Sequence, residues 1–185
     1  IKPSDIISDA SVRNAAKACV ALGGSTNAAI HLIAIARRAG ASFTLDDFND
    51  IGRQVPVLAN VQPSGEYIMH EFADAGGLPA MLTQLATELE LDCATVTGAT
   101  LGDNIANARI VDADVIRSMD NPVAREALAV LKGNLAPNGC VIKPSAASAE
   151  LMQHRGRAVV FNDADDLAAR IHSLDLEVDS RSVLV

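Results

Sequence analysis

Two glycines, Gly23 and Gly24, separate two stretches that both have the apolar periodicity of an α-helix. Residues 9–22 and residues 26–39 place apolar side chains three and four positions apart, which is helical spacing. Gly40 follows the second stretch and suits the left-handed residue that ends many helices. The chain is therefore predicted to begin with two helices joined by a tight turn. The second helix is apolar on nearly all sides, so we expect it to be buried.

The turn itself contains the residues best suited to contact a ligand, namely Gly24, Ser25, Thr26 and Asn27. Ser25 or Thr26 can cap the second helix with its hydroxyl group. The N–H groups of a first helical turn carry partial positive charge, which favours an anion such as a carboxylate or a phosphate. Glycine lets the backbone approach such a ligand closely. The alternative, on these residues alone, is a tight turn that binds nothing.

More helices and a few short strands are expected in the first 115 residues. Thr44 and Asp47 resemble a capping box, with Asp where Glu is usual. Residues 55–60 form a short apolar run between turn residues, which predicts a buried strand. The other helices are predicted at residues 45–54, 66–75, 79–89 and 100–108, and a short strand is predicted at residues 93–97.

The pattern changes between residues 109 and 122, which are acidic and weakly periodic and end in Asp120-Asn121-Pro122. We therefore predict two domains, residues 1–115 and residues 116–185. The fold class is α/β, with a helix-rich first part and a β-rich second part. In the second part we expect strands at residues 127–131, 139–143, 157–161 and 182–185 and a helix at residues 163–172.

Charge and hydropathy exclude several functional classes. The formal net charge is −8, whereas nucleic-acid binding needs a basic face. A small anionic substrate needs only a local positive potential, so the net charge does not exclude one. No apolar run approaches the roughly 20 residues that span a bilayer, and the polar start of the chain does not resemble a signal peptide. These features predict a cytoplasmic protein with no membrane or nucleic-acid partner.

The three cysteines, Cys19, Cys93 and Cys140, are widely spaced and odd in number. This spacing fits neither a disulfide framework nor a close-spaced metal motif. Each cysteine lies among apolar or small residues, so we expect each to behave as a small buried apolar side chain. Three thiolates from separate segments can hold an iron–sulfur cluster, but nothing in the spacing favours that here. No metal ligand is therefore assigned to this chain.

Several motifs, in order along the chain, resemble the dihydroxy-acid dehydratase/phosphogluconate dehydratase (IlvD/Edd) family, which includes the sugar-acid (aldonate) dehydratases. The first is the run from Gly23 to Leu32, Gly-Gly-Ser-Thr-Asn followed by an apolar helix with His31. The others are Pro63-Ser64-Gly65-Glu66-Tyr67, Ala75-Gly76-Gly77-Leu78-Pro79, Thr95-Val96-Thr97-Gly98 and Lys132-Gly133-Asn134-Leu135-Ala136-Pro137-Asn138-Gly139. Any one motif is weak, but their number and order make the resemblance specific.

The resemblance implies that this chain is an internal piece of a hydro-lyase about three times as long. Residues 1–115 would be the C-terminal part of an α/β domain of the cluster- and metal-binding type. Residues 116–185 would begin a β-barrel-like, swivel-like domain. The family uses an iron–sulfur cluster and Mg²⁺, but their ligands and the catalytic serine base fall outside the matched part. The resemblance thus implies no catalytic residue here and leaves Gly24, Ser25, Thr26 and Asn27 as substrate-binding candidates.

The implied reaction removes water from a 2,3-dihydroxy acid, either a branched-chain acid or a sugar acid, to give a 2-oxo acid. The resemblance also implies a homodimer or homotetramer for the full-length enzyme and no activity for this piece alone. Asp47-Phe48, residues 72–77 and residues 154–157 resemble the sugar-acid branch more closely. The alternatives are a non-catalytic anion-binding or assembly module with a dehydratase-like sequence, and a structural helical domain that drives oligomerisation.

A few other polar residues are candidates for the same site. His31 follows Asn27 by four residues and shares its helix face, but a structural histidine is the commoner case. Lys143 ends a predicted strand, where it could meet an acid substrate or lie in solvent. His154 and the adjacent Arg155-Gly156-Arg157 precede another strand and could face solvent or a second subunit.

Overall fold

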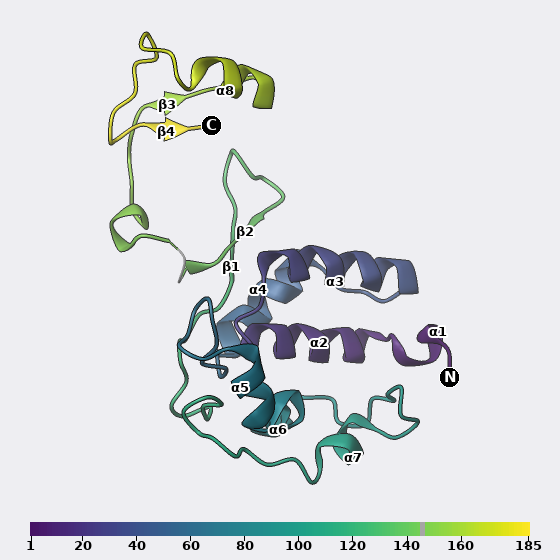
Figure 1. Ribbon diagram of the computed structural model, residues 1–185. Helices are drawn as coiled ribbons and strands as arrows, with labels where there is room; N and C mark the ends of the chain where they lie inside the picture. Colours follow the sequence, from purple (N-terminus) through teal and green to yellow (C-terminus); the bar gives the residue numbers. More distant parts are fainter. Residues whose placement is uncertain (145–146) are drawn as a thin grey trace. The chain divides into compact units, whose positions relative to one another are not determined.

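The computed structural model describes residues 1–144 and 147–185. The chain divides into two compact units, Ile1–Ala146 and Ala147–Val185 (Figure 1). Both are mixtures of helices and small two-stranded sheets. Among the described helices, none combines the length and the apolar character that crossing a bilayer requires.

The first unit is mainly helical, as predicted. Its helices are α1 (Pro3–Ile6), α2 (Asp9–Ala21), α3 (Thr26–Ala39), α4 (Leu45–Gln54), α5 (Met69–Asp74), α6 (Gly77–Gln84) and α7 (Leu101–Ile105), with a 3₁₀ turn η1 (Ala86–Glu88). Strands β1 (Ala129–Leu131) and β2 (Cys140–Ile142) form an antiparallel hairpin in which Val130 is opposite Val141. The hairpin packs against α3 and α4.

Helices α2 and α3 lie side by side and run in opposite directions (Figure 1). The Oγ of Ser8 caps α2 by accepting from the N–H of Ser11 at 3.2 Å. The predicted capping box begins α4, where Thr44 N donates to the Asp47 carboxylate at 2.9 Å and Asp47 N donates to the Thr44 hydroxyl at 3.2 Å. Local side-chain chemistry therefore determines where α2 and α4 begin.

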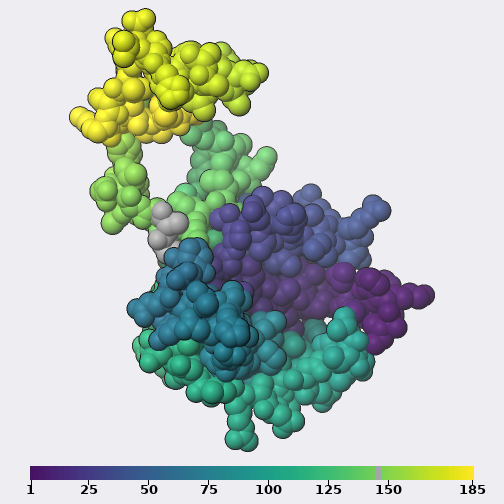
Figure 2. Space-filling model, in the orientation of Figure 1, coloured from purple at the N-terminus to yellow at the C-terminus, as the bar shows by residue number. Residues whose placement is uncertain are grey.

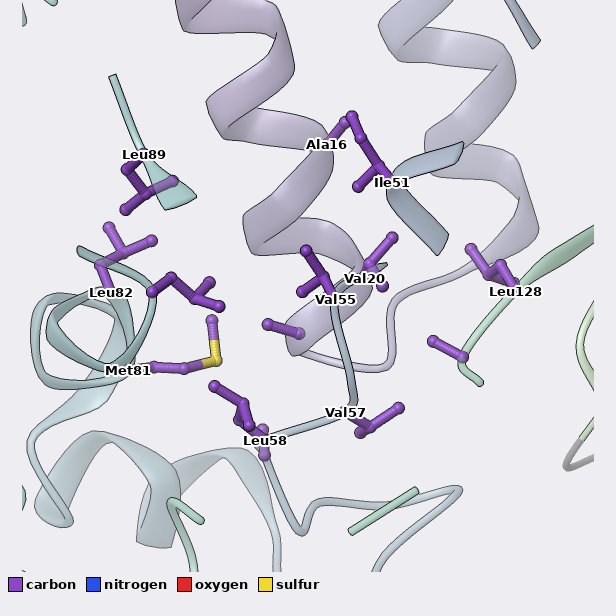
Figure 3. Close-up of a cluster of buried hydrophobic side chains, with 14 of the residues drawn as sticks. Ala16, Val20, Ile51, Val55, Val57, Leu58, Met81, Leu82, Leu89 and Leu128 are labelled. Atoms are coloured by element: carbon purple, nitrogen blue, oxygen red, sulfur yellow. The ribbon is translucent and has the colours of Figure 1, made fainter. Parts of the chain in front are cut away.

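The centre of the first unit is the segment 55–61, which is buried along its whole length. Figure 3 shows Val55, Val57 and Leu58 of this segment beside Val20 of α2 and Met81 of α6. The segment was predicted as a strand, and its backbone is extended. Its pairing, however, consists of isolated bridges to residues 67, 116 and 124. The strand prediction is corrected in this respect, because the segment hydrogen-bonds to several short pieces of chain.

Asn60 connects the end of this segment to the loop that follows it. Only 7% of Asn60 is exposed, and its side chain donates to the Asp114 carbonyl and accepts from the Glu66 N–H at 3.1 Å. Gly65 lies against it, and a Cβ there would be 2.3 Å from the Asn60 carbonyl carbon and 2.5 Å from the Val61 nitrogen. The loop therefore requires glycine at position 65.

The same bonds explain why the helix predicted at residues 66–75 is shorter. The N–H of Tyr67 donates to the Asn60 carbonyl at 3.0 Å, so residues 66 and 67 do not join the helix. Helix α5 begins only at Met69. The helical periodicity of the sequence includes residues 66–68, but part of their backbone is already hydrogen-bonded to the central segment. This tertiary contact prevents them from joining the helix.

The expectation that the second helix is buried was wrong. In α3 only Ala29 and Ala36 are buried, while Ile30 and Ile35 are 64% and 48% exposed. Figure 2 shows α3, in dark blue, at the surface of its unit. The helix contacts α2 and α4, and its residues Leu32 and Ile33 pack partly buried against the core, whereas Ile30 and Ile35 stay outside. An all-round apolar pattern cannot indicate which side of a helix faces its neighbours.

The second unit contains a parallel strand pair and one helix. Strands β3 (Ala158–Val159) and β4 (Val183–Leu184) pair in parallel, and Asp163 caps α8 (Ala164–Arg170). A 3₁₀ turn, η3 (Ala149–Leu151), precedes them. Within residues 1–144 and 147–185 the strands form open two-stranded sheets and no closed barrel. The α/β class is thus supported in its coarse form, as helices with small sheets.

The first compact unit extends past residue 115, where the sequence predicts a domain boundary. Residues 115–124 remain with it because their backbone pairs with the central segment, for example Val57 N with the Ala124 carbonyl at 2.8 Å. Strand β1 also packs against α4. The boundary at 115/116, as a division of a longer protein, stays a prediction.

We expect Gly65→Ala to destabilise the first unit by about 2–3 kcal/mol, because its new Cβ would overlap backbone atoms that cannot rotate away. The measurement is urea unfolding followed by circular dichroism. The matched control is Gly133→Ala, since a Cβ at position 133 meets nothing within 4 Å. Equal unfolding midpoints for the two variants would contradict this account of the loop.

We expect the cap of α4 to make stability depend on pH through Asp47. Its pKa lies below the usual range, chiefly because the Thr44 hydroxyl donates to it, with a further contribution from Arg13, whose guanidinium is 3.0 Å away. A lowered folded pKa stabilises the fold above the unfolded pKa, and the effect disappears as the pH falls through the folded value, below about pH 4.

Asp47→Asn should therefore show a smaller loss of stability between pH 5 and pH 3 than the parent chain, in urea unfolding at each pH. Asp50→Asn on the same helix is the control, because Asp50 is exposed and forms no ion pair within the described residues. If Asp50→Asn and Asp47→Asn have the same acid profile, the cap does not carry this pH dependence.

Candidate functional site

The turn between α2 and α3 is a Schellman-type helix end. Gly23 has φ +69°, its N–H donates to the Val20 carbonyl, and the N–H of Gly24 donates to the Cys19 carbonyl, both at 2.9 Å. A Cβ on Gly24 would lie 2.6 Å from the Cys19 sulfur and 2.9 Å from its carbonyl oxygen. The two glycines are therefore required for different reasons, the first for its backbone conformation and the second for close packing.

Ser25 begins α3 as its N-cap, as predicted. Its hydroxyl accepts from the N–H of Asn27 at 3.2 Å, and its carbonyl accepts from the N–H of Ala28 at 3.0 Å. Within the described part of the chain, no acceptor is found for the N–H groups of Ser25 and Thr26. Those two donors lie at the positive end of a 14-residue helix. The turn thus offers backbone donors to an anion.

Lys143 reaches this turn from the end of the β1–β2 hairpin. Its ammonium group donates to the Gly23 carbonyl at 2.9 Å, and the two residues are 120 positions apart in the sequence. The lysine is half-buried. A positive charge therefore lies next to the helix end that presents the free N–H groups.

The charge on Lys143 also acts on Cys19. Burial raises the pKa of the Cys19 thiol, and Lys143 partly opposes this rise. The net shift is upward, so the thiol stays protonated at neutral pH. Cys19 is thus a packing residue beneath Gly24, and the lysine charge is available to other groups at the turn.

The candidate residues at the turn differ in their exposure. Ser25 and Asn27 are exposed, while Gly24 and Thr26 are half-buried. His31 is exposed and lines a groove between α1 and α3 with Ile7 and Ile35. No hydrogen bond joins His31 to Asn27 within residues 1–144 and 147–185.

The structure adds Lys143 to this group, which sequence reasoning could name only as an isolated strand-end lysine. Pairing it with Gly23 required the fold of the hairpin onto α3 and α4. The only sequence signal was its place at the end of an apolar run. His154 lies in the second unit, where its Nε2 is 2.9 Å from the Arg181 carbonyl.

The cysteines occupy three separate elements. Cys19 is in α2, Cys93 is in the loop before α7, and Cys140 is in β2; all three are free thiols. Cys19 and Cys93 are half-buried and Cys140 is exposed, so the expectation of three buried cysteines was wrong. Among the described residues, no three His, Cys, Asp or Glu side chains come together as a metal site. The residues present therefore do not fit a complete iron–sulfur or magnesium centre, and none is assigned as a ligand.

Comparison with known proteins identifies two family models in tandem. The model described as dihydroxy-acid/6-phosphogluconate dehydratase N-terminal matches residues 1–104, and its C-terminal counterpart matches residues 114–185. The candidate site includes residues from both matched regions. The turn at residues 23–27 lies in the N-terminal match, and Lys143 lies in the C-terminal match.

Curated relatives agree with these matches. The chain is 45% identical to L-arabinonate dehydratase of Rhizobium leguminosarum bv. trifolii and 48% identical to L-arabonate dehydratase of Azospirillum brasilense, over 100% and 98% of this chain. It is 43% identical to a dihydroxy-acid dehydratase of Clostridium botulinum over 90% of its length. The matches cover 32%, 32% and 31% of these relatives, so the chain spans about a third of their length.

Two adjoining family models thus cover almost the whole chain in the expected order. Relatives named for sugar-acid and for dihydroxy-acid dehydration match it at similar identity. The chain belongs to the dihydroxy-acid/6-phosphogluconate dehydratase family.

Proposed function

We propose that this chain is part of a hydro-lyase that converts a 2,3-dihydroxy acid into a 2-oxo acid. The observation that carries the proposal is the match to both family models, in order, over residues 1–104 and 114–185. In this reaction the C3 hydroxyl leaves as water and the C2 proton is removed. The resulting enol then tautomerises to the 2-oxo acid.

The proposed role of this chain is to bind the substrate acid group at the start of α3. The donors would be the N–H groups of Ser25 and Thr26, with Gly24 allowing close approach and Asn27 lining the same turn. Lys143 would supply the positive charge, because its ammonium group already lies at the Gly23 carbonyl. A carboxylate bound by backbone donors and a cation is held more strongly than by neutral donors alone.

The chemical step itself is proposed to use groups outside this chain. Enzymes of this family are generally iron–sulfur proteins, and a cluster with Mg²⁺ would provide Lewis-acid chemistry for the leaving hydroxyl. No ligand to either is assigned to the described residues, because they do not form a metal site. The contribution proposed for this chain is substrate binding and positioning.

We also propose a sugar acid as the substrate. Two relatives named for arabinonate match this chain at 45% and 48% identity over 98–100% of it, while a relative named for dihydroxy acids matches at 43% over 90%. The resemblance of residues 72–77 and 154–157 to the sugar-acid branch points the same way.

The remaining architecture is proposed from the family. Residues 1–115 would complete an α/β domain, and residues 116–185 would begin a β-barrel-like domain whose first strands include β1 and β2. The full-length enzyme would be a homodimer or homotetramer. It would be cytoplasmic, because the three free thiols of this chain are typical of proteins in a reducing compartment.

The isolated 185-residue chain should not turn over, whereas the longer protein should produce a 2-oxo acid from L-arabinonate faster than from 2,3-dihydroxy-3-methylbutanoate. The measurement is 2-oxo acid formation, detected as the semicarbazone. Turnover by the isolated chain would contradict the proposal that the chemical step uses groups outside this chain. If the longer protein binds these acids without converting either, it is the non-catalytic anion-binding module instead.

Lys143→Gln in the longer protein should lower kcat/KM by about 10- to 100-fold, because a charge-assisted hydrogen bond contributes about 1.5–3 kcal/mol. The effect should appear mainly in KM, since the lysine is proposed to bind the acid group. Lys143→Arg should recover part of the loss.

Lys132→Gln is the matched control for this variant. It removes the same charge from the same hairpin, but Lys132 is exposed and its ammonium group pairs with Asp46. Thermal unfolding of each variant separates a folding defect from a binding defect. If Lys132→Gln and Lys143→Gln change kcat/KM equally, Lys143 has no specific role at the turn.

A further inference from the structure

The second unit contains a pocket of about 370 Å³ whose lining is dominated by arginine. Arg155, Gly156, Arg157, Asp179 and Arg181 form its walls. All five residues belong to the unit Ala147–Val185 and lie outside the turn discussed above. This unit has seven acidic side chains and four arginines, so its charge is net negative. Three of the four arginines nevertheless line this one pocket.

The pocket is held in place by backbone contacts. The N–H of Val183 donates to the Arg157 carbonyl at 2.9 Å, next to the β3–β4 pairing. Gly156 lies so close to the returning chain that a Cβ would be 1.7 Å from the Arg181 carbonyl oxygen. His154 contacts that same oxygen through Nε2 at 2.9 Å. These contacts hold the two arginine-bearing segments side by side.

The charges at the pocket are not all neutralised within the described residues. Arg157 pairs with Glu177, with a nitrogen–oxygen distance of 2.9 Å. Arg155 and Arg181 have no carboxylate within 4.0 Å among residues 1–144 and 147–185. Two guanidinium groups therefore line the pocket without an ion-pair partner.

Asp179 is the one carboxylate in the lining, and it is engaged locally. It accepts from the N–H of Arg181 at 2.9 Å and from the Ser182 hydroxyl at 3.0 Å. These bonds keep its pKa low, first through the Arg181 N–H and then through Ser182. Its negative charge is therefore permanent at neutral pH and competes with any anion that enters the pocket.

We propose that this pocket binds a phosphate group, held by Arg155 and Arg181. A planar guanidinium offers two parallel N–H donors that match phosphate oxygens, and two such groups suit a tetrahedral dianion. The small volume and the acidic surroundings favour a single small anion over a nucleic-acid backbone, which needs an extended basic face. The group would come from inorganic phosphate or from a small phosphate monoester. The proposal is independent of the dehydratase activity.

The test is a phosphate titration of the 185-residue chain, followed by amide chemical shifts at constant ionic strength and pH 7.5. We expect saturable shifts at residues 154–157 and 179–182. A parallel titration with glycerol 3-phosphate compares a phosphate monoester with inorganic phosphate. Whichever binds more tightly is the form of phosphate that the pocket prefers. Acetate, with a single negative charge and a planar group, should bind at least about tenfold more weakly than phosphate.

Two sets of variants keep the test independent of a folding failure. Arg155→Gln with Arg181→Gln should weaken phosphate binding at least about tenfold. Arg37→Gln with Arg125→Gln removes the same charge from exposed positions in the first unit and should leave the affinity unchanged. Asp179→Asn should strengthen binding several-fold, because the amide oxygen can still accept from the Arg181 N–H while the competing charge is removed.

The proposal fails if the shifts grow linearly with phosphate, or if sodium chloride alone reproduces them. It also fails if the Arg155/Arg181 variant binds phosphate as well as its control does. A gain of affinity in Asp179→Asn, together with the loss in the arginine variant, would establish the pocket as the binding site.

Discussion

The first unit depends on an extended segment that has no regular sheet around it. Residues 55–61 are buried, so each of their backbone N–H and carbonyl groups needs a partner inside the protein. The partners come from a helix end and from loops. The N–H groups of Leu58 and Ala59 both donate to the Ala21 carbonyl, at 2.7 and 3.1 Å, while Val115 accepts from Asn60 N at 2.9 Å. Chain pieces far apart in sequence are thereby held at one place.

This arrangement also determines where the candidate site lies. Ala21 is the last residue of α2, and the Gly23–Gly24 turn follows it directly. The same helix end thus hydrogen-bonds to the buried segment and to the turn residues. A Cβ on Gly23 would be 3.3 Å from the Val57 side chain, so the turn is packed on the core as well as bonded to it. The donors of α3 are consequently presented from a rigid base, which is what a binding site requires.

Much of the first unit could be predicted from local sequence, because helix ends carry local signals. The limits of α2, α3 and α4 follow from Ser8, Gly40 and the Thr44–Asp47 capping box, and these agree with the structure within a residue. The exposure of α3 and the pairing of residues 55–61 could not be predicted in this way. Both depend on which distant segment occupies a given face, and a periodicity calculated along one segment contains no such information.

The same distinction applies to the residues proposed for binding. Ser25 could be found from its position before an apolar helix, but the link between Lys143 and Gly23 joins residues 120 apart. The arginine pocket likewise forms only because the chain returns from Gly156 to Arg181.

A net charge of −8 argues against a polyanionic partner, but it does not decide whether the chain binds a small anion. Screening limits the reach of an exposed charge to about 10 Å, so the few cations that line a site determine its potential. In an acidic chain, binding of a small anion therefore depends on the fold gathering a few cations.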